Sequence, residues 1–142
     1  MKILIDTNIL VYADNKRSIW SESCNNIIEK SLNNSNLVLC IPQKSLIEYY
    51  RSSTSKAINL PIEKVIENIH FYIENFMILY DNPSSTEIML ELALESGASS
   101  GKIFDLNILA TALHFNIEIL YTVNIKDFPK VKNLRILLPD QL

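Results

Sequence analysis

Short apolar runs alternate with helix-like segments along the whole chain, and this alternation limits the fold more than any other feature of the sequence. Five runs are strand-sized and mainly apolar. They span residues 2–5, 37–41, 76–79, 118–121 and 135–138. Runs of this kind, without an exposed polar face, are typical of strands buried in a parallel sheet.

The segments between these runs carry apolar residues at helical spacing. Helices are predicted from Thr7-Asn8 into 9–12, over 18–31, from Pro42 over 43–53, from Pro61 over 62–69, from Ser85 or Thr86 to 96, and over 103–115. Gly97 is a suitable residue just past the end of a helix. Strands and helices in alternation predict an α/β fold in which a mostly parallel sheet is flanked by helices.

Length and composition fit one domain over residues 1–142, with 48% hydrophobic and 20% charged residues. The longest apolar runs are too short to span a membrane, and no signal peptide is apparent. The two cysteines form no CxxC pair, so we expect a reduced, cytoplasmic setting. Only two glycines are present, which excludes a glycine-rich phosphate loop. A net charge of −3 without a basic block does not indicate a strongly electrostatic nucleic-acid binder, but it is compatible with a nucleic-acid enzyme that holds metal.

Asp6 directly follows the first predicted strand, in the stretch ILIDTNIL. In open parallel sheets, ligands bind beyond the carboxyl ends of the strands. A helix cap or a turn explains an aspartate at this position about as well as a ligand site does. Both interpretations therefore stay open from the local sequence.

Glu48 lies in QKSLIEYYRSS, one helical turn after Lys44 and just before Arg51. An exposed ion-pair ladder explains this spacing, and each such pair contributes only about 0.2–0.5 kcal/mol. Ile47, Tyr49 and their neighbours, however, surround the glutamate with bulky side chains. The local sequence alone favours the ladder.

Asp105 is the least ordinary carboxylate, because in KIFDLNILATAL it shares a helical face with Ile108, Leu109 and Ala112. A buried, unpaired charge costs several kcal/mol unless it is paired, hydrogen-bonded or bound to metal. A place in the first helical turn, where the helix dipole favours negative charge, is the structural alternative. The stronger interpretation is a functional carboxylate.

A fourth polar cluster, YTVNIKDF, follows the strand predicted at 118–121. Asn124 or Asp127 can therefore reach the same sheet edge as Asp6. An ordinary turn built from Asn and Asp is the competing interpretation.

Together these four segments resemble the PIN-domain ribonucleases, above all the VapC-type toxins of toxin–antitoxin pairs. The motifs are ILIDTNILVY, the helix after IPQKSLIEYY, GKIFDLNILATAL and LYTVNIKDFPKV, and their order and spacing cover nearly the whole chain. The resemblance implies a parallel sheet flanked by helices, with acidic residues at the carboxyl ends of the strands.

The same resemblance implies that Asp6, Glu48 and Asp105 form a catalytic, metal-binding acidic triad. Asn124 matches a fourth position that is Asp in some members, and Asp127 is an alternative for it. Thr7 matches a residue whose hydroxyl orients the site. Hard oxygen ligands suit Mg²⁺ or Mn²⁺, and no Cys/His cluster suggests zinc.

The expected activity is metal-dependent hydrolysis of RNA phosphodiester bonds by a toxin with a small antitoxin partner. A homodimer is also expected, through apolar residues of the helix starting at 61 or of the helix over 18–31. The competing hypothesis is a weak or inactive PIN-like module that binds nucleic acid or protein, since Asn124 removes one charge from the site. A receiver-like phospho-accepting domain is less well supported, because no second acidic residue adjoins Asp6.

Overall fold

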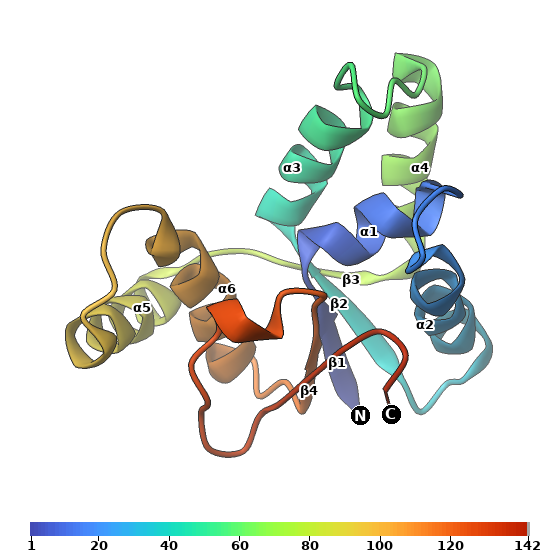
Figure 1. The fold of residues 1–142 in the computed structure, drawn as a ribbon. Coiled ribbons are helices and arrows are strands. Elements are labelled where there is room, and N and C mark those ends of the chain that lie inside the picture. Colours follow the sequence, from blue (N-terminus) through green and yellow to red (C-terminus); the bar gives the residue numbers. More distant parts are fainter. Residues whose placement is uncertain (142) are drawn as a thin grey trace.

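Five parallel strands form one sheet in the computed structural model, which describes residues 1–141 (Figure 1). They are β1 (Lys2–Ile5), β2 (Val38–Pro42), β3 (Met77–Leu79), β4 (Ile119–Tyr121) and β5 (Arg135–Leu137). Their order in the sheet is β3-β2-β1-β4-β5, and Leu4 of the central strand lies beside Cys40 and Leu120. The α/β fold predicted from the alternating pattern is confirmed.

Within residues 1–141, six α-helices and two 3-10 helices connect these strands. The α-helices are α1 (Thr7–Asp14), α2 (Ser21–Asn33), α3 (Gln43–Ser53), α4 (Ile62–Asn75), α5 (Pro83–Ser96) and α6 (Ile103–His114). The 3-10 helices are η1 (Ser100–Lys102) and η2 (Ile125–Asp127). In Figure 1, α1 and α2 lie on one side of the sheet, α5 and α6 lie on the other, and α3 and α4 rise together above it.

Each face of the sheet has its own hydrophobic core, because successive residues of a strand point to opposite faces. Ile3 and Ile5 pack into the cluster that includes residues of α1 to α4. Leu4 packs into the cluster that includes Leu109 of α6. None of the helices described in residues 1–141 is long and apolar enough to cross a membrane.

The two cysteines, Cys24 and Cys40, are buried and free, one in each core. Burial raises the pKa of the Cys40 thiol to about 11 and that of Cys24 to about 12. Both thiols therefore act as small apolar side chains, as expected from the absence of a CxxC pair.

Three helix starts differ from the sequence prediction, and the first is α2, which begins at Ser21 rather than at residue 18. The N-cap of α1 is Asp6 rather than Thr7 or Asn8, and that of α5 is Asn82 rather than Ser85 or Thr86. Helix α5 starts earlier because Pro83 is already in the first turn, where its missing N–H costs nothing. The Asn82 side chain accepts from the Ser85 backbone N–H, and the Ser85 hydroxyl accepts from the Asn82 N–H. Gly97 ends α5 with a positive φ of 66°, as predicted.

Candidate active site

Asp6 lies at the junction of β1 and α1 and is 92% buried, with only 8% of its surface exposed. Its backbone N–H donates to the carbonyl of Tyr121 at 3.0 Å, which extends the pairing of β1 with β4 by one residue. Its Oδ1 accepts from the N–H of Thr7 at 2.8 Å. The helix-cap interpretation of this aspartate is therefore confirmed, and the cap fixes the orientation of the carboxylate.

The other oxygen of Asp6 is held by side chains that the sequence analysis did not single out. Thr122 donates its hydroxyl to Asp6 Oδ2 at 2.9 Å, and Asn8 donates its amide to the same oxygen at 3.2 Å. Thr122 is completely buried and follows β4, the neighbour of β1. The signal that could have revealed it is its place directly after a strand, two residues before Asn124.

Glu48 joins the site through α3. The hydroxyl of Thr7 donates to Glu48 Oε2 at 2.7 Å and so connects the start of α1 to α3. Lys44 pairs with Asp81 at 3.1 Å, and no ion pair within residues 1–141 joins Glu48 to a lysine or arginine. The ion-pair ladder favoured by the local sequence is therefore wrong.

Asp105 is half-buried in the first turn of α6, while Ile108, Leu109 and Ala112 on the same face are buried. No hydrogen bond within the described part of the chain reaches its carboxylate, so its oxygens are available to a ligand. The predicted conflict between this charge and an apolar helix is partly relieved, because the helix start leaves Asp105 open to solvent.

Most of the predicted site residues line one cavity of about 330 Å³. It is lined by Asp6, Thr7, Asn8, Val11, Tyr12, Glu48, Ser52, Asp105 and Asn124. Asp127 is absent from this lining and lies on a neighbouring cavity. Of the two residues considered for the fourth position, Asn124 therefore shares the cavity with the triad.

The pKa of Asp6 reflects its burial and the other carboxylates of this cavity. Burial is the largest cause that raises the pKa of Asp6, and the charges of Asp105 and Glu48 raise it further. Hydrogen bonds from Thr122 and Thr7 oppose this rise by stabilising the charged form.

The pKa of Asp105 is raised as well, first by burial, then by Asp127 and Glu48, while Lys102 lowers it. Negative charges that destabilise one another are expected to bind a cation, which relieves the repulsion.

The chemistry of the donor set fits a hard divalent cation, because every donor is an oxygen. Asp6 Oδ1 accepts one hydrogen bond and keeps a lone pair free, and Asp105 has both oxygens free. As the side chains lie, no three acidic, His or Cys groups within residues 1–141 are close enough to form a metal cluster. The carboxylates therefore line one cavity, but they are not arranged as a complete set of metal ligands.

A model of the PIN domain family matches residues 3–134. The chain belongs to the PIN domain family. This match ends just before β5 and includes all the residues that line the cavity. No curated protein sequence gave a significant match.

Solved structures with the same fold include several toxin–antitoxin proteins. A chain of VapBC2 from Rickettsia felis, bound to a promoter DNA fragment, is 27% identical, with 97% of this chain and 98% of that chain covered and a TM-score of 0.70. A chain of VapBC-1 from nontypeable Haemophilus influenzae is 22% identical, with 99% and 100% covered and a TM-score of 0.72. VapC20 from Mycobacterium tuberculosis, described as a Sarcin-Ricin loop cleaving toxin, is 10% identical, with 88% and 92% covered and a TM-score of 0.69. The resemblance to VapC-type PIN domains is thereby confirmed.

Proposed function

We propose that this PIN domain is a metal-dependent endoribonuclease that hydrolyses RNA phosphodiester bonds, and that it is the toxin of a type II toxin–antitoxin pair acting in the cytoplasm. The supporting observation is that Asp6, Glu48 and Asp105, from three distant segments, line one cavity beyond the carboxyl end of β1. A scaffold without cation chemistry has no reason to gather repelling charges in this way. The similarity to VapC20, a Sarcin-Ricin loop cleaving toxin, supports the same class of activity.

In this proposal Asp6 and Asp105 bind Mg²⁺ or Mn²⁺ directly, and Glu48 binds it directly or through water. When bound, the cation activates a water molecule and offsets the charge that develops on the phosphoryl oxygens. The protein orients the ligands. It also buries them, and the exclusion of water strengthens their electrostatic interactions.

The hydrogen bonds around the triad suit this task. Thr7 orients Glu48, whereas Thr122 and Asn8 hold one oxygen of Asp6 and leave the other with a free lone pair. Asn124 offers a neutral amide oxygen in the fourth position. A neutral group there lowers the total negative charge, so we expect weaker metal binding than four carboxylates would give.

The test is cleavage of a structured RNA by the purified protein with Mn²⁺ or Mg²⁺, stopped by a chelator. Asp6→Asn and Asp105→Asn should each abolish cleavage while the circular dichroism spectrum stays that of a folded protein. Glu91→Gln removes the same charge from the exposed side of α5 and serves as the matched control. Equal cleavage by all three variants would show that the site lies elsewhere.

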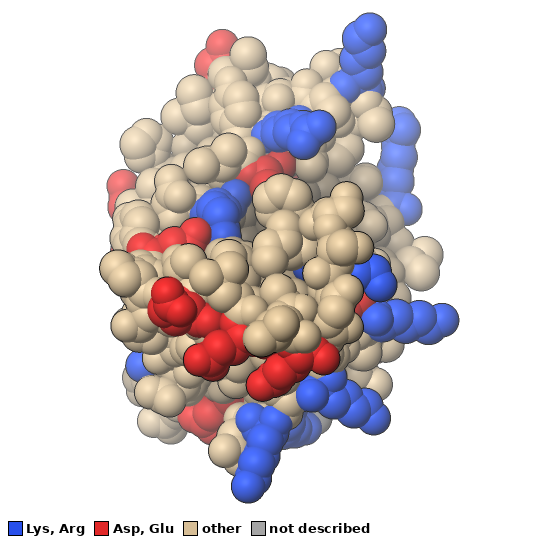
Figure 2. All heavy atoms as spheres, turned by 90° about the vertical axis from the view of Figure 1, so that its left-hand side faces the viewer, with Lys and Arg blue, Asp and Glu red and all other residues tan. Residues whose placement is uncertain are grey.

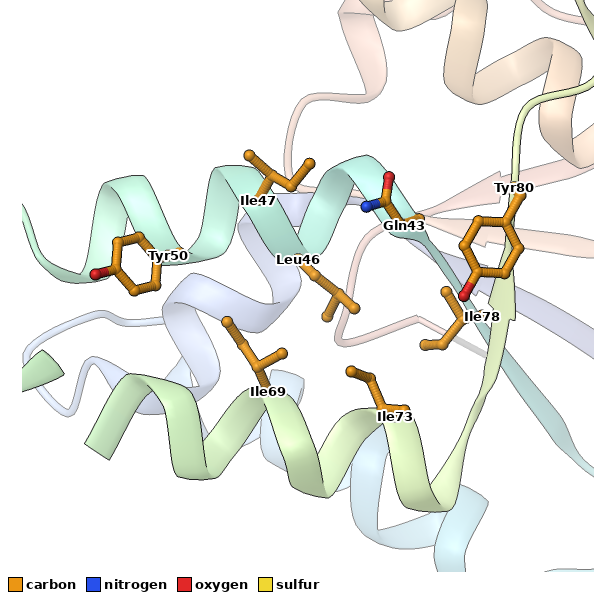
Figure 3. A pocket seen from close by; sticks show the side chains of 8 residues that line it. All are labelled: Gln43, Leu46, Ile47, Tyr50, Ile69, Ile73, Ile78 and Tyr80. Atoms are coloured by element: carbon orange, nitrogen blue, oxygen red, sulfur yellow. The ribbon is translucent and has the colours of Figure 1, made fainter. Parts of the chain in front are cut away.

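An antitoxin partner is proposed from the VapBC complexes among the similar structures. An apolar groove of about 430 Å³ between α3, α4 and β3 offers a surface for an amphipathic segment of such a partner (Figure 3). Ile47 is 59% exposed and Ile73 is 50% exposed at this groove. Replacing both by Glu should prevent co-purification with the product of the neighbouring reading frame without abolishing RNA cleavage.

A homodimer is also proposed, because α4 carries further exposed apolar residues, among them Ile62 and Ile66. Light scattering of the purified protein tests this. A mass of one chain at all concentrations would refute it.

A binding module without turnover is the second candidate. It is favoured by Asn124 and by the lack of a closed metal-ligand cluster among the described residues. If the purified protein binds RNA in the presence of Mn²⁺ and the RNA stays intact, the binding module is the correct description.

A further inference from the structure

A second polar cavity of about 330 Å³ adjoins the carboxylate cavity and has a different chemistry. It lies between the loop that joins α5 to α6, the first turns of α6, and η2. Lys102 and Lys126 line it together with Asp127, and Ser96 and Ser99 add side-chain hydroxyl groups. Its size falls within the range of about 300–1,000 Å³ that is usual for ligand pockets.

The two cavities are joined by charge as well as by position. Lys102 precedes Asp105 by one helical turn, and both Lys102 and Asp127 act electrostatically on the Asp105 carboxylate. A group that occupies the second cavity would therefore lie next to the proposed catalytic centre.

The lysines of this cavity are available for a ligand. Neither Lys102 nor Lys126 forms an ion pair within 4 Å in the part of the chain that the structure describes. Two lysines and one aspartate leave one net positive charge, which equals the charge of a single phosphodiester in magnitude. Lysine acts on a phosphate as a point charge with three donors.

An acidic face on the side of α5 (Figure 2) makes positive charge in this cavity important for holding an RNA strand. Acidic side chains gather across the middle of the face shown in Figure 2, and lysines and arginines project mainly from its edges. Helix α5, which lies on that side of the molecule, exposes Glu87, Glu91 and Glu95. An RNA strand that approaches the acidic triad is repelled by the triad and by this acidic face. Positive charge nearby is needed to offset this repulsion.

We propose that the cavity lined by Lys102 and Lys126 binds a phosphodiester of the RNA strand adjacent to the one that is cleaved. This inference rests on the proposed nuclease function for the identity of the ligand. The competing explanation is that Lys102 only balances the charge of Asp105, and in that case Lys126 has no part in binding.

The experiment measures binding of a fluorescent single-stranded RNA by anisotropy, in a chelator so that no cleavage occurs. One neutralised phosphodiester should contribute about 0.7 to the magnitude of the slope of log affinity against log salt, which is about a five-fold change in affinity at 0.1 M salt. Lys102→Gln and Lys126→Gln should each weaken binding by up to about five-fold, and the double variant, which no longer neutralises the phosphodiester, should lose the full five-fold together with about 0.7 of the slope. Lys16→Gln, in the exposed loop after α1, is the charge-matched control and should bind like the wild type.

The outcomes separate this inference from the proposed function. If the wild type binds RNA but does not cleave it, the nuclease proposal fails and the phosphate site can still be read from the salt slopes. If the lysine variants keep the wild-type affinity and slope, or if the wild type does not bind RNA, the phosphate site is refuted. Where cleavage is measurable, Lys126→Gln should raise KM by a similar factor and leave kcat nearly unchanged.

Discussion

Replacing Asp105 by Asn is expected to stabilise the metal-free protein. Burial raises the pKa of Asp105, the charges of Asp127 and Glu48 raise it further, and Lys102 opposes this in part. A raised carboxyl pKa means that folding disfavours the charged form. Asparagine keeps the shape of the side chain and removes the charge, so the folded state loses an unfavourable interaction.

The expected gain is small, because Asp105 is only half-buried and water screens its charge. We expect an increase of about 0.5–1 kcal/mol in the free energy of unfolding at pH 8. For a chain of this length this corresponds to about 1–4 °C in Tm.

The gain should depend on pH with a defined sign. Below the unfolded-state pKa of about 3.9, Asp105 is protonated in both states and contributes nothing. Its destabilising effect develops as the pH rises through the raised pKa of the folded state and is complete above it. The difference in Tm between variant and wild type should therefore be larger at pH 8 than at pH 4.

Metal should reverse the order of stability. The wild type is expected to gain about 2.7 kcal/mol when free Mn²⁺ is at 100 times its Kd, whereas the variant lacks one of the proposed ligands and should gain less. The assay is thermal melting followed by circular dichroism at both pH values, in chelator and in Mn²⁺, with Glu91→Gln as the control for loss of one exposed charge. The reasoning is refuted if Asp105→Asn melts below the wild type in chelator at pH 8, or if Mn²⁺ stabilises both proteins equally.

Three further substitutions test the surroundings of the site. Thr122→Val removes the hydroxyl that donates to Asp6, and should cost about 1.5–3 kcal/mol in urea unfolding and weaken Mn²⁺ binding in calorimetry; unchanged metal affinity would show that this hydrogen bond does not support the site. Tyr49→Phe removes the hydroxyl that donates to half-buried Asp14, and a similar loss is expected in urea with RNA cleavage retained; a loss below about 0.5 kcal/mol would contradict a stabilising role. Leu109→Ala empties a fully buried position of α6 and should cost about 2–5 kcal/mol, so a variant as stable as the wild type would mean that this core collapses around the gap.

The strands and the parallel sheet were predictable because they depend on local pattern. An apolar run such as 2–5 is buried on both faces wherever it sits in such a sheet, and the structure places it in the centre. Helix starts were less predictable, because a cap depends on which side chain reaches the free N–H groups. Asn82 is the N-cap of α5 because it forms reciprocal hydrogen bonds with Ser85. Composition does not reveal which of several polar residues forms such bonds.

The supporting residues of the site escaped the sequence analysis for a topological reason. Thr122 reaches Asp6 only because β4 pairs with β1, although 116 positions separate the two residues. The order of strands in a sheet is not contained in their order along the chain. Lys44 shows the same dependence on strand order. The loop after β3 places Asp81 beside Lys44, which therefore pairs with Asp81 and not with Glu48.

The two interpretations of Asp6, helix cap and metal ligand, are compatible because each uses a different part of the carboxylate. The cap uses one lone pair of Oδ1 and places the charge at the positive end of the α1 dipole, which offsets part of the cost of burial. Thr122 and Asn8 hold Oδ2, so the group has little rotational freedom. The remaining lone pair of Oδ1 is therefore held in a fixed direction before any cation arrives, and a cation that binds there loses less free energy to ordering its ligand.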